Sequence, residues 1–146
     1  MKKIINSTVC IVLSLVFIVC LAACNPSSHE NSDENIWDSA TYLEDTEIGS
    51  GAKTIIVEVK AIDKLVTLTV KTDKDTVGAA LLEYDLIAGE DGRYGLYVKK
   101  VNNILADYDV NGYYWAFYID GEIAMTGVDG TAIEEGVTYT LEYAKG

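Results

Sequence analysis

The segment that most constrains the fold is aromatic and spans residues 112–122, with the sequence Gly-Tyr-Tyr-Trp-Ala-Phe-Tyr-Ile-Asp-Gly-Glu. Its run of large side chains favours a β-strand, in which successive side chains point to opposite faces. One face then carries Tyr113, Trp115, Phe117 and Ile119, and the other carries Tyr114, Ala116 and Tyr118. Asp120-Gly121 suits the positive φ angles of a two-residue hairpin turn. We expect the Trp115 face to be buried, and Tyr114 and Tyr118 to be candidates for contact with a partner.

The rest of the sequence after residue 52 has the patterns of one small β-rich domain. Alternating and β-branched residues predict strands at residues 53–62, 65–72, 94–101, 112–119 and 137–143. Helix-capping residues up to Thr76, followed by an apolar stripe, predict a helix from residue 77 to about 87. Residues 105–112 are predicted to be a loop. The order β-β-α-β-β-β predicts the α+β class: a small, mostly antiparallel β-sheet domain with one packed helix over residues 53–146.

The N-terminal segment has the layout of a secretory signal. Lys2 and Lys3 precede an apolar run at residues 9–22, which is shorter than the roughly 20 residues that a membrane span needs. The sequence Leu-Ala-Ala-Cys at residues 21–24 resembles the bacterial lipobox, in which the cysteine is lipidated and becomes the first residue of the mature protein. We therefore expect residues 1–23 to be a lipoprotein signal peptide. Cys24 is expected to anchor the protein in the cell membrane, on its extracytoplasmic face.

Residues 24–52 are rich in Ser, Asn, Asp and Glu and show little periodicity, which predicts a flexible tether. Trp37 and Tyr42 are its large apolar exceptions, and they either dock on the domain or recognise a partner. The three cysteines of the chain all lie at or before residue 24. The mature domain is therefore expected to contain no disulfide.

The composition argues against several classes of function. Nine basic and 23 acidic residues follow the predicted lipidation site, which gives the mature chain a net charge of −14 and disfavours nucleic acids as partners. The single histidine, His29, lies in the predicted tether, so the sequence has no serine–histidine–aspartate set and no Cys/His metal spacing. Asp107, Asp109 and Asn111 have the alternating spacing of a calcium loop but lack its downstream glutamate, and the alternative is a solvated loop. We expect no enzymatic activity, no cofactor and no metal.

Residues 76–143 resemble the small C-terminal domain of the transcobalamin and intrinsic-factor family. They are most similar to bacterial surface proteins that carry this domain alone, often described only as a domain of unknown function. The matching elements run in order along the chain: Thr76-Val77, Ala80-Leu81, Gly95–Val101, Tyr114-Trp115, residues 118–122, Gly127 and Glu135-Gly136. The family has a proline where this chain has Leu96. The resemblance implies a transcobalamin C-terminal-like fold.

In that family a corrinoid is held between this domain and a larger helical domain. The resemblance implies ligand contacts at Gly95, Leu96, Tyr97 and Val98, and on the strand that carries Tyr114, Trp115 and Tyr118. We thus expect a lipid-anchored surface protein that captures a corrinoid or a similar small ligand for uptake, with a membrane transporter as partner. The alternative is a protein–protein interaction module without a small-molecule ligand, which uses a sheet edge or the Tyr114 and Tyr118 face.

Overall fold

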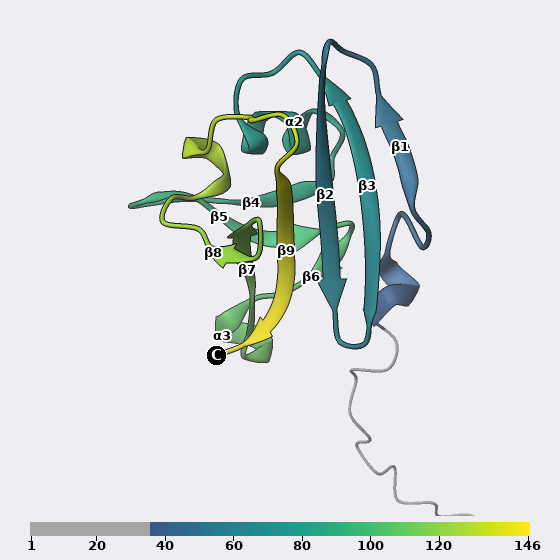
Figure 1. The fold of residues 1–146 in the computed structure, drawn as a ribbon. Coiled ribbons are helices and arrows are strands. Elements are labelled where there is room, and N and C mark those ends of the chain that lie inside the picture. The colour runs from purple at the N-terminus through teal and green to yellow at the C-terminus, as the bar shows by residue number, and fades with distance from the viewer. Residues whose placement is uncertain (1–35) are drawn as a thin grey trace, which may run out of the picture. The chain divides into compact units, whose positions relative to one another are not determined.

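The structure is a computed structural model that describes residues 36–146; the predicted signal peptide and Cys24 lie outside the described residues. Six strands form one sheet in the order β1-β3-β2-β9-β7-β8 (Figure 1). They are β1 (Thr46–Gly49), β2 (Lys53–Ala61), β3 (Lys64–Thr72), β7 (Tyr113–Ile119), β8 (Glu122–Ile123) and β9 (Thr138–Lys145). β1 runs parallel to β3 and β2 runs parallel to β9, whereas the other neighbouring strands are antiparallel.

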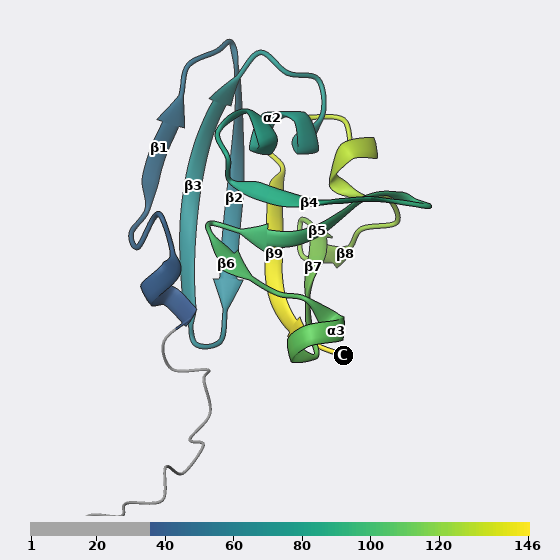
Figure 2. The same ribbon diagram turned by 180° about the vertical axis from the view of Figure 1, so that it is seen from behind.

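A second sheet and a helix cover one face of this six-stranded sheet. The second sheet is antiparallel, with the order β4-β5-β6. The covering elements are α2 (Val77–Glu83), β4 (Ile87–Gly92), β5 (Gly95–Val101), β6 (Ile104–Leu105) and the short helix η2 (Val128–Gly130). Figure 2 shows β4 and β5 running across β2 and β9 rather than along them. The prediction of a mostly antiparallel α+β domain with one main helix is confirmed.

The core lies between the two layers. Along β2 and β3, every second side chain is buried: Ile55, Val57, Val59, Val66, Leu68 and Val70. The strand register places Val57 between Leu68 of β3 and Tyr139 of β9, so one buried row crosses three strands. The alternate residues, such as Glu58, point to the opposite face, which no element of the described residues covers (Figure 1). The six-stranded sheet therefore has a buried inner face and an open outer face.

The main helix is shorter than predicted. It begins after Thr76, whose hydroxyl accepts a hydrogen bond from the Ala79 amide at 3.3 Å, as a helix N-cap does. It ends at Glu83 rather than near residue 87, because Asp85 has a φ of 54° that a right-handed helix cannot continue. The chain then enters β4, which the sequence did not predict, since residues 89–92 are glycines and acidic residues typical of a turn. Pairing with β5 stabilises this strand.

The structure corrects the predicted end of the tether at residue 52, because residues 36–49, the N-terminal strap, pack on the domain. The strap contains the short helix η1 (Ile36–Ser39) and β1. The Trp37 indole Nε1 donates a hydrogen bond to the Ala61 carbonyl at 3.1 Å. The Asn102 side chain bonds both the amide and the carbonyl of Tyr42, at 2.8 and 2.7 Å. Trp37 and Tyr42 therefore dock on the domain, and the folded region extends N-terminally beyond residue 53.

The predicted loop at residues 105–112 also contains regular structure. Its first residue belongs to β6, and α3 (Tyr108–Asn111) forms a single helical turn. The Asp107 carboxylate caps this turn by accepting a hydrogen bond from the Asp109 amide at 3.1 Å. The predicted hairpin turn after β7 is confirmed, because Asp120 and Gly121 have φ angles of 49° and 81°.

Candidate functional site

The predicted ligand-contact residues lie in two different sheets. Gly95, Leu96, Tyr97 and Val98 belong to β5, whereas Tyr114, Trp115 and Tyr118 belong to β7. On β7, the alternation sends Tyr114 and Tyr118 to the open outer face and Trp115 to the inner face. The structure therefore does not bring the seven residues together, and it separates them into a β5 surface, a core position and a β7 surface.

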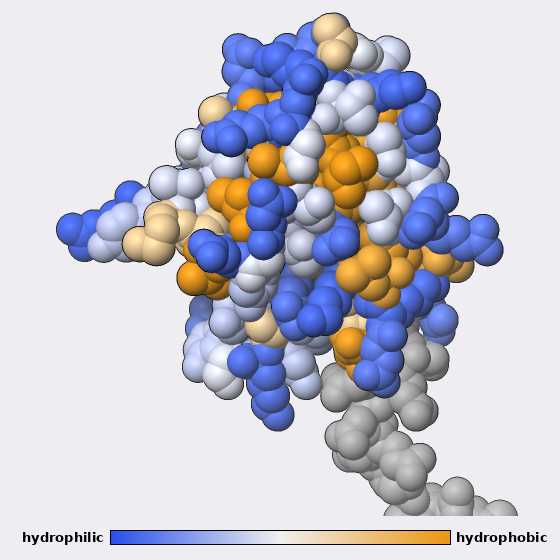
Figure 3. Space-filling view, viewed as in Figure 1, coloured by the Kyte–Doolittle hydropathy of each residue, from blue (hydrophilic) through white to orange (hydrophobic). Residues whose placement is uncertain are grey.

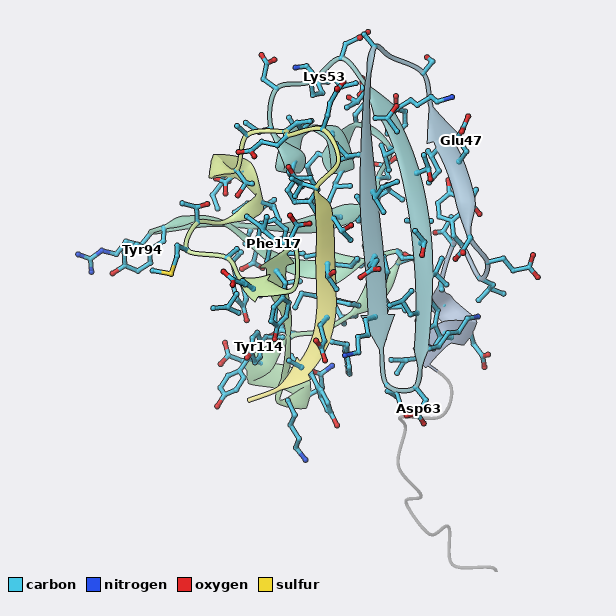
Figure 4. All side chains as sticks on the ribbon, viewed as in Figure 1. Glu47, Lys53, Asp63, Tyr94, Tyr114 and Phe117 are labelled. Atoms are coloured by element: carbon cyan, nitrogen blue, oxygen red, sulfur yellow. The ribbon has the colours of Figure 1, made fainter. Side chains whose placement is uncertain are left out.

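The β5 surface belongs to the β4–β5 hairpin, which projects from the side of the domain (Figure 4). Tyr94, in the turn between the two strands, is 89% exposed, and Tyr97 on β5 is 42% exposed. The Arg93 guanidinium lies 5.6 Å from the centre of the Tyr94 ring. Leu96 and Val98 instead pack against the core. Among the predicted β5 contacts, Tyr97 is the large side chain that a ligand can reach.

Close packing around two glycines sets the position of this hairpin. A Cβ atom at Gly89 would lie 2.0 Å from the carbonyl oxygen of Tyr97, so a larger residue does not fit at this bulge. Gly95 has a φ of +105°, and a Cβ there would lie 2.5 Å from Oδ2 of Asp129 in η2. The sequence pattern predicted that Tyr94 belongs to a strand, whereas the structure places Tyr94 in the turn with an exposed side chain. Its position one residue before a glycine is a signal of a turn and of exposure.

Lys99 joins two carboxylates on the exposed face of β5. Its Nζ lies 3.1 Å from Oε1 of Glu90 and 3.1 Å from Oδ2 of Asp107. Hydrogen bonds, first to Asp107 and then to Glu90, raise the pKa of Lys99 above its ordinary value. Because Asp107 also caps α3, both of its carboxylate oxygens are engaged within the chain. Among residues 36–146, no group of three or more His, Cys, Asp or Glu is placed to hold a metal ion.

Trp115 is part of the core. It is 7% exposed, and its ring meets the Tyr143 ring edge-on at 5.5 Å between centroids. Its indole Nε1 has no hydrogen-bond partner among the described residues. Phe117 and Ile119, on the same face of β7, also pack against the core. The predicted burial is confirmed for Trp115, whereas Phe117 and Ile119 are half-buried, and Trp115 offers little surface that a ligand could contact.

Comparisons with known proteins agree with this fold. Residues 74–145 match the model of a family described as a domain of unknown function (DUF4430). A solved structure from Ruminococcus gnavus, described as that of a candidate metal-binding protein, is similar with a TM-score of 0.61 and 29% identity, over 65% of this chain and 99% of that one. Haptocorrin in complex with cobinamide (Cbi) is similar with a TM-score of 0.51 and 17% identity, over 64% of this chain and 25% of the haptocorrin chain. None of the curated proteins compared with the chain is a significant match.

These comparisons confirm the fold that the sequence motifs predicted. The chain corresponds to about a quarter of haptocorrin, because the similarity covers 25% of that protein. Within residues 36–146, no helix is long and apolar enough to cross a membrane. Residues 74–145 match the DUF4430 family model, and the folded part of the chain has the transcobalamin C-terminal-like fold.

Proposed function

We propose that this protein is a lipid-anchored binding protein on the extracytoplasmic face of the cell membrane, and that it captures a corrinoid or a similar flat ligand for uptake. The lipobox-like sequence that ends at Cys24 supports the anchor. The fold shared with haptocorrin, which was solved in complex with cobinamide, supports the ligand class. In this proposal a membrane transporter receives the ligand.

The observation that carries the proposal is the pair of exposed tyrosines on the β4–β5 hairpin. A tyrosine ring is flat and apolar with a polar end, so it suits contact with a planar conjugated ligand. Tyr94 is exposed on the part of the hairpin that projects from the domain (Figure 4), and Tyr97 is exposed on β5 of the same hairpin. A single hairpin covers one side of a corrinoid, whereas tight sites bury most of their ligand. We therefore expect the transporter to cover the other side.

Isothermal titration calorimetry of the full-length protein with cobinamide and cobalamin tests the ligand. Replacing Tyr97 by alanine should weaken binding about tenfold, since it removes one ring contact of roughly 1.4 kcal/mol. Tyr118→Ala is the matched control, because it removes the same side chain from the opposite side of the domain and should leave the affinity unchanged. An absence of heat at high micromolar ligand, with and without a candidate transporter, would reject corrinoid capture.

The anchor has a separate test. Mass spectrometry of the protein from the membrane fraction should find an acylated Cys24 at the N-terminus, because the lipobox cysteine becomes the first residue. Cys24→Ala should leave the signal peptide attached or release the protein from the membrane fraction after processing elsewhere. An unmodified Cys24 in the mature protein would contradict the anchor without bearing on the ligand.

A further inference from the structure

The outer face of the six-stranded sheet carries a depression that is separate from the hairpin. It has a volume of about 330 Å³ and lies over β2, β3, β7 and β9. Its lining includes Glu58, Lys60, Leu65, Tyr118, Thr140 and Glu142. Figure 3 shows hydrophobic and hydrophilic side chains interspersed on this face. Neither Tyr94 nor Tyr97 lines the depression, so it is a second surface with its own chemistry.

The strand register explains why these groups meet. Thr140 of β9 lies between Glu58 of β2 and Tyr118 of β7, and all three point outward. The Thr140 hydroxyl donates a hydrogen bond to Oε2 of Glu58 at 2.8 Å. In the adjacent outward row, Nζ of Lys60 lies 3.1 Å from Oε1 of Glu142. These contacts hold the polar groups in position before a ligand arrives, which lowers the entropy cost of binding.

The lining contains hydrogen-bond acceptors, a donor, and hydroxyl groups that both donate and accept. The carboxylates of Glu58 and Glu142 accept, the Lys60 ammonium donates, and the hydroxyls of Thr140 and Tyr118 do both. Two carboxylates disfavour an anionic ligand, and the Lys60 ammonium, which pairs with Glu142, disfavours a simple cation. A neutral ligand whose hydroxyl groups both donate and accept matches this set.

The apolar part of the lining fits the same ligand class. The Tyr118 ring and Leu65, which is 47% exposed, flank the polar groups. A pyranose ring has C–H faces that pack on such surfaces while its hydroxyls reach the polar groups. We propose that this depression binds a neutral saccharide.

Two features favour a small saccharide over a peptide. The lining strands β2 and β9 each have a strand on both sides, so their backbone groups are not available for an added peptide strand. The volume of about 330 Å³ is near the lower end of the roughly 300–1,000 Å³ found for small-molecule sites. One or two sugar units fit such a depression better than a long chain.

NMR titration of the ¹⁵N-labelled full-length protein, in a detergent without a sugar head group, tests the proposal. The probes are glucose, galactose, mannose and N-acetylglucosamine at millimolar concentration. We expect saturable shifts at the amides of Glu58, Lys60, Tyr118 and Thr140 with at least one probe. Tyr118→Ala should weaken this binding about tenfold, whereas Tyr118→Phe should retain the ring contact and most of the affinity.

Tyr97→Ala is the control on the hairpin and should leave the saccharide affinity unchanged. Its spectrum, and that of Tyr118→Ala, should otherwise match the wild type, which shows that both variants fold. No saturable shift with any of the four sugars would overturn the proposal, as would shifts confined to the β4–β5 hairpin. Concentration-dependent self-association that Tyr118→Ala abolishes would also overturn it, because the face would then be an interface between copies of the chain.

Discussion

Asn102 is predicted to hold the N-terminal strap to the domain, and its replacement measures the strength of that contact. Asn102 lies in the turn between β5 and β6, is 1% exposed and has a φ of 49°. Its side-chain amide pairs with the amide and the carbonyl of Tyr42 as a neighbouring strand would. Glycine at this position removes the two hydrogen bonds and tolerates the backbone angle, whereas alanine also strains the backbone.

The magnitude follows from those two contacts. Each hydrogen bond contributes about 0.5–1.5 kcal/mol net, so Asn102→Gly should lower the free energy of unfolding by about 1–3 kcal/mol. Asn102→Ala should cost about 1 kcal/mol more, because an alanine in the left-handed region is disfavoured by roughly that amount. The difference between the two variants separates the backbone term from the hydrogen bonds.

Urea unfolding monitored by tryptophan fluorescence gives these free energies, provided that the m-value is unchanged. A shortened chain that begins at residue 44 is the second reference, because it lacks Tyr42. In that chain Asn102→Gly should cost far less, and the non-additivity reports the strap contact directly. If Asn102→Gly costs less than about 0.5 kcal/mol, or costs the same in both chains, the amide does not hold the strap.

Three further predictions concern the core, the hairpin and pH. Tyr139→Phe should lower the free energy of unfolding by about 1–3 kcal/mol, because the buried hydroxyl accepts a hydrogen bond from the Glu134 amide at 2.9 Å. Urea unfolding measures this change, and an unchanged midpoint would contradict the prediction. Gly89→Ala should destabilise the hairpin, since its Cβ would lie 2.0 Å from the Tyr97 carbonyl oxygen. Hydrogen exchange should then show faster opening of β4 and β5, and unchanged exchange rates would argue against this clash. The pKa of Lys99 is raised in the folded state, so the charged form of Lys99 stabilises the folded protein. This contribution to the free energy of unfolding should be complete below the ordinary pKa of 10.5 and should be lost as the pH rises through the higher folded pKa. The stability difference between wild type and Lys99→Met should shrink over that alkaline range, and a constant difference would refute the assignment.

The aromatic segment shows what a local pattern can predict. Its two faces followed from the period of two, and Trp115 is buried as expected, with Tyr118 on the outer face. The turn followed from Asp120-Gly121, because few other dipeptides adopt two successive positive φ angles. These features depend on neighbouring residues alone, so the sequence contains the information directly.

The N-terminal strap shows the limit of predictions from local sequence patterns. Its polar composition predicted a tether, yet it is ordered by Asn102, which is 60 residues away from Tyr42 in the sequence. β4 was missed for the same reason, since its glycines and acidic residues form a strand by pairing with β5. In both cases long-range hydrogen bonds outweigh a weak local preference.

The sequence by itself determined the β-rich class, the faces of the aromatic strand and the similarity to the transcobalamin C-terminal-like fold. Each of these depends on alternation, turn chemistry or motif order, which are properties of short segments. Only the tertiary structure decided that Tyr97 and Tyr118 belong to different sheets, and that the predicted site divides into a hairpin surface and an outer-face depression. The physical reason is that a side chain's face is set by its own strand, whereas the sheet that a strand joins is set by its hydrogen-bond partners elsewhere in the chain.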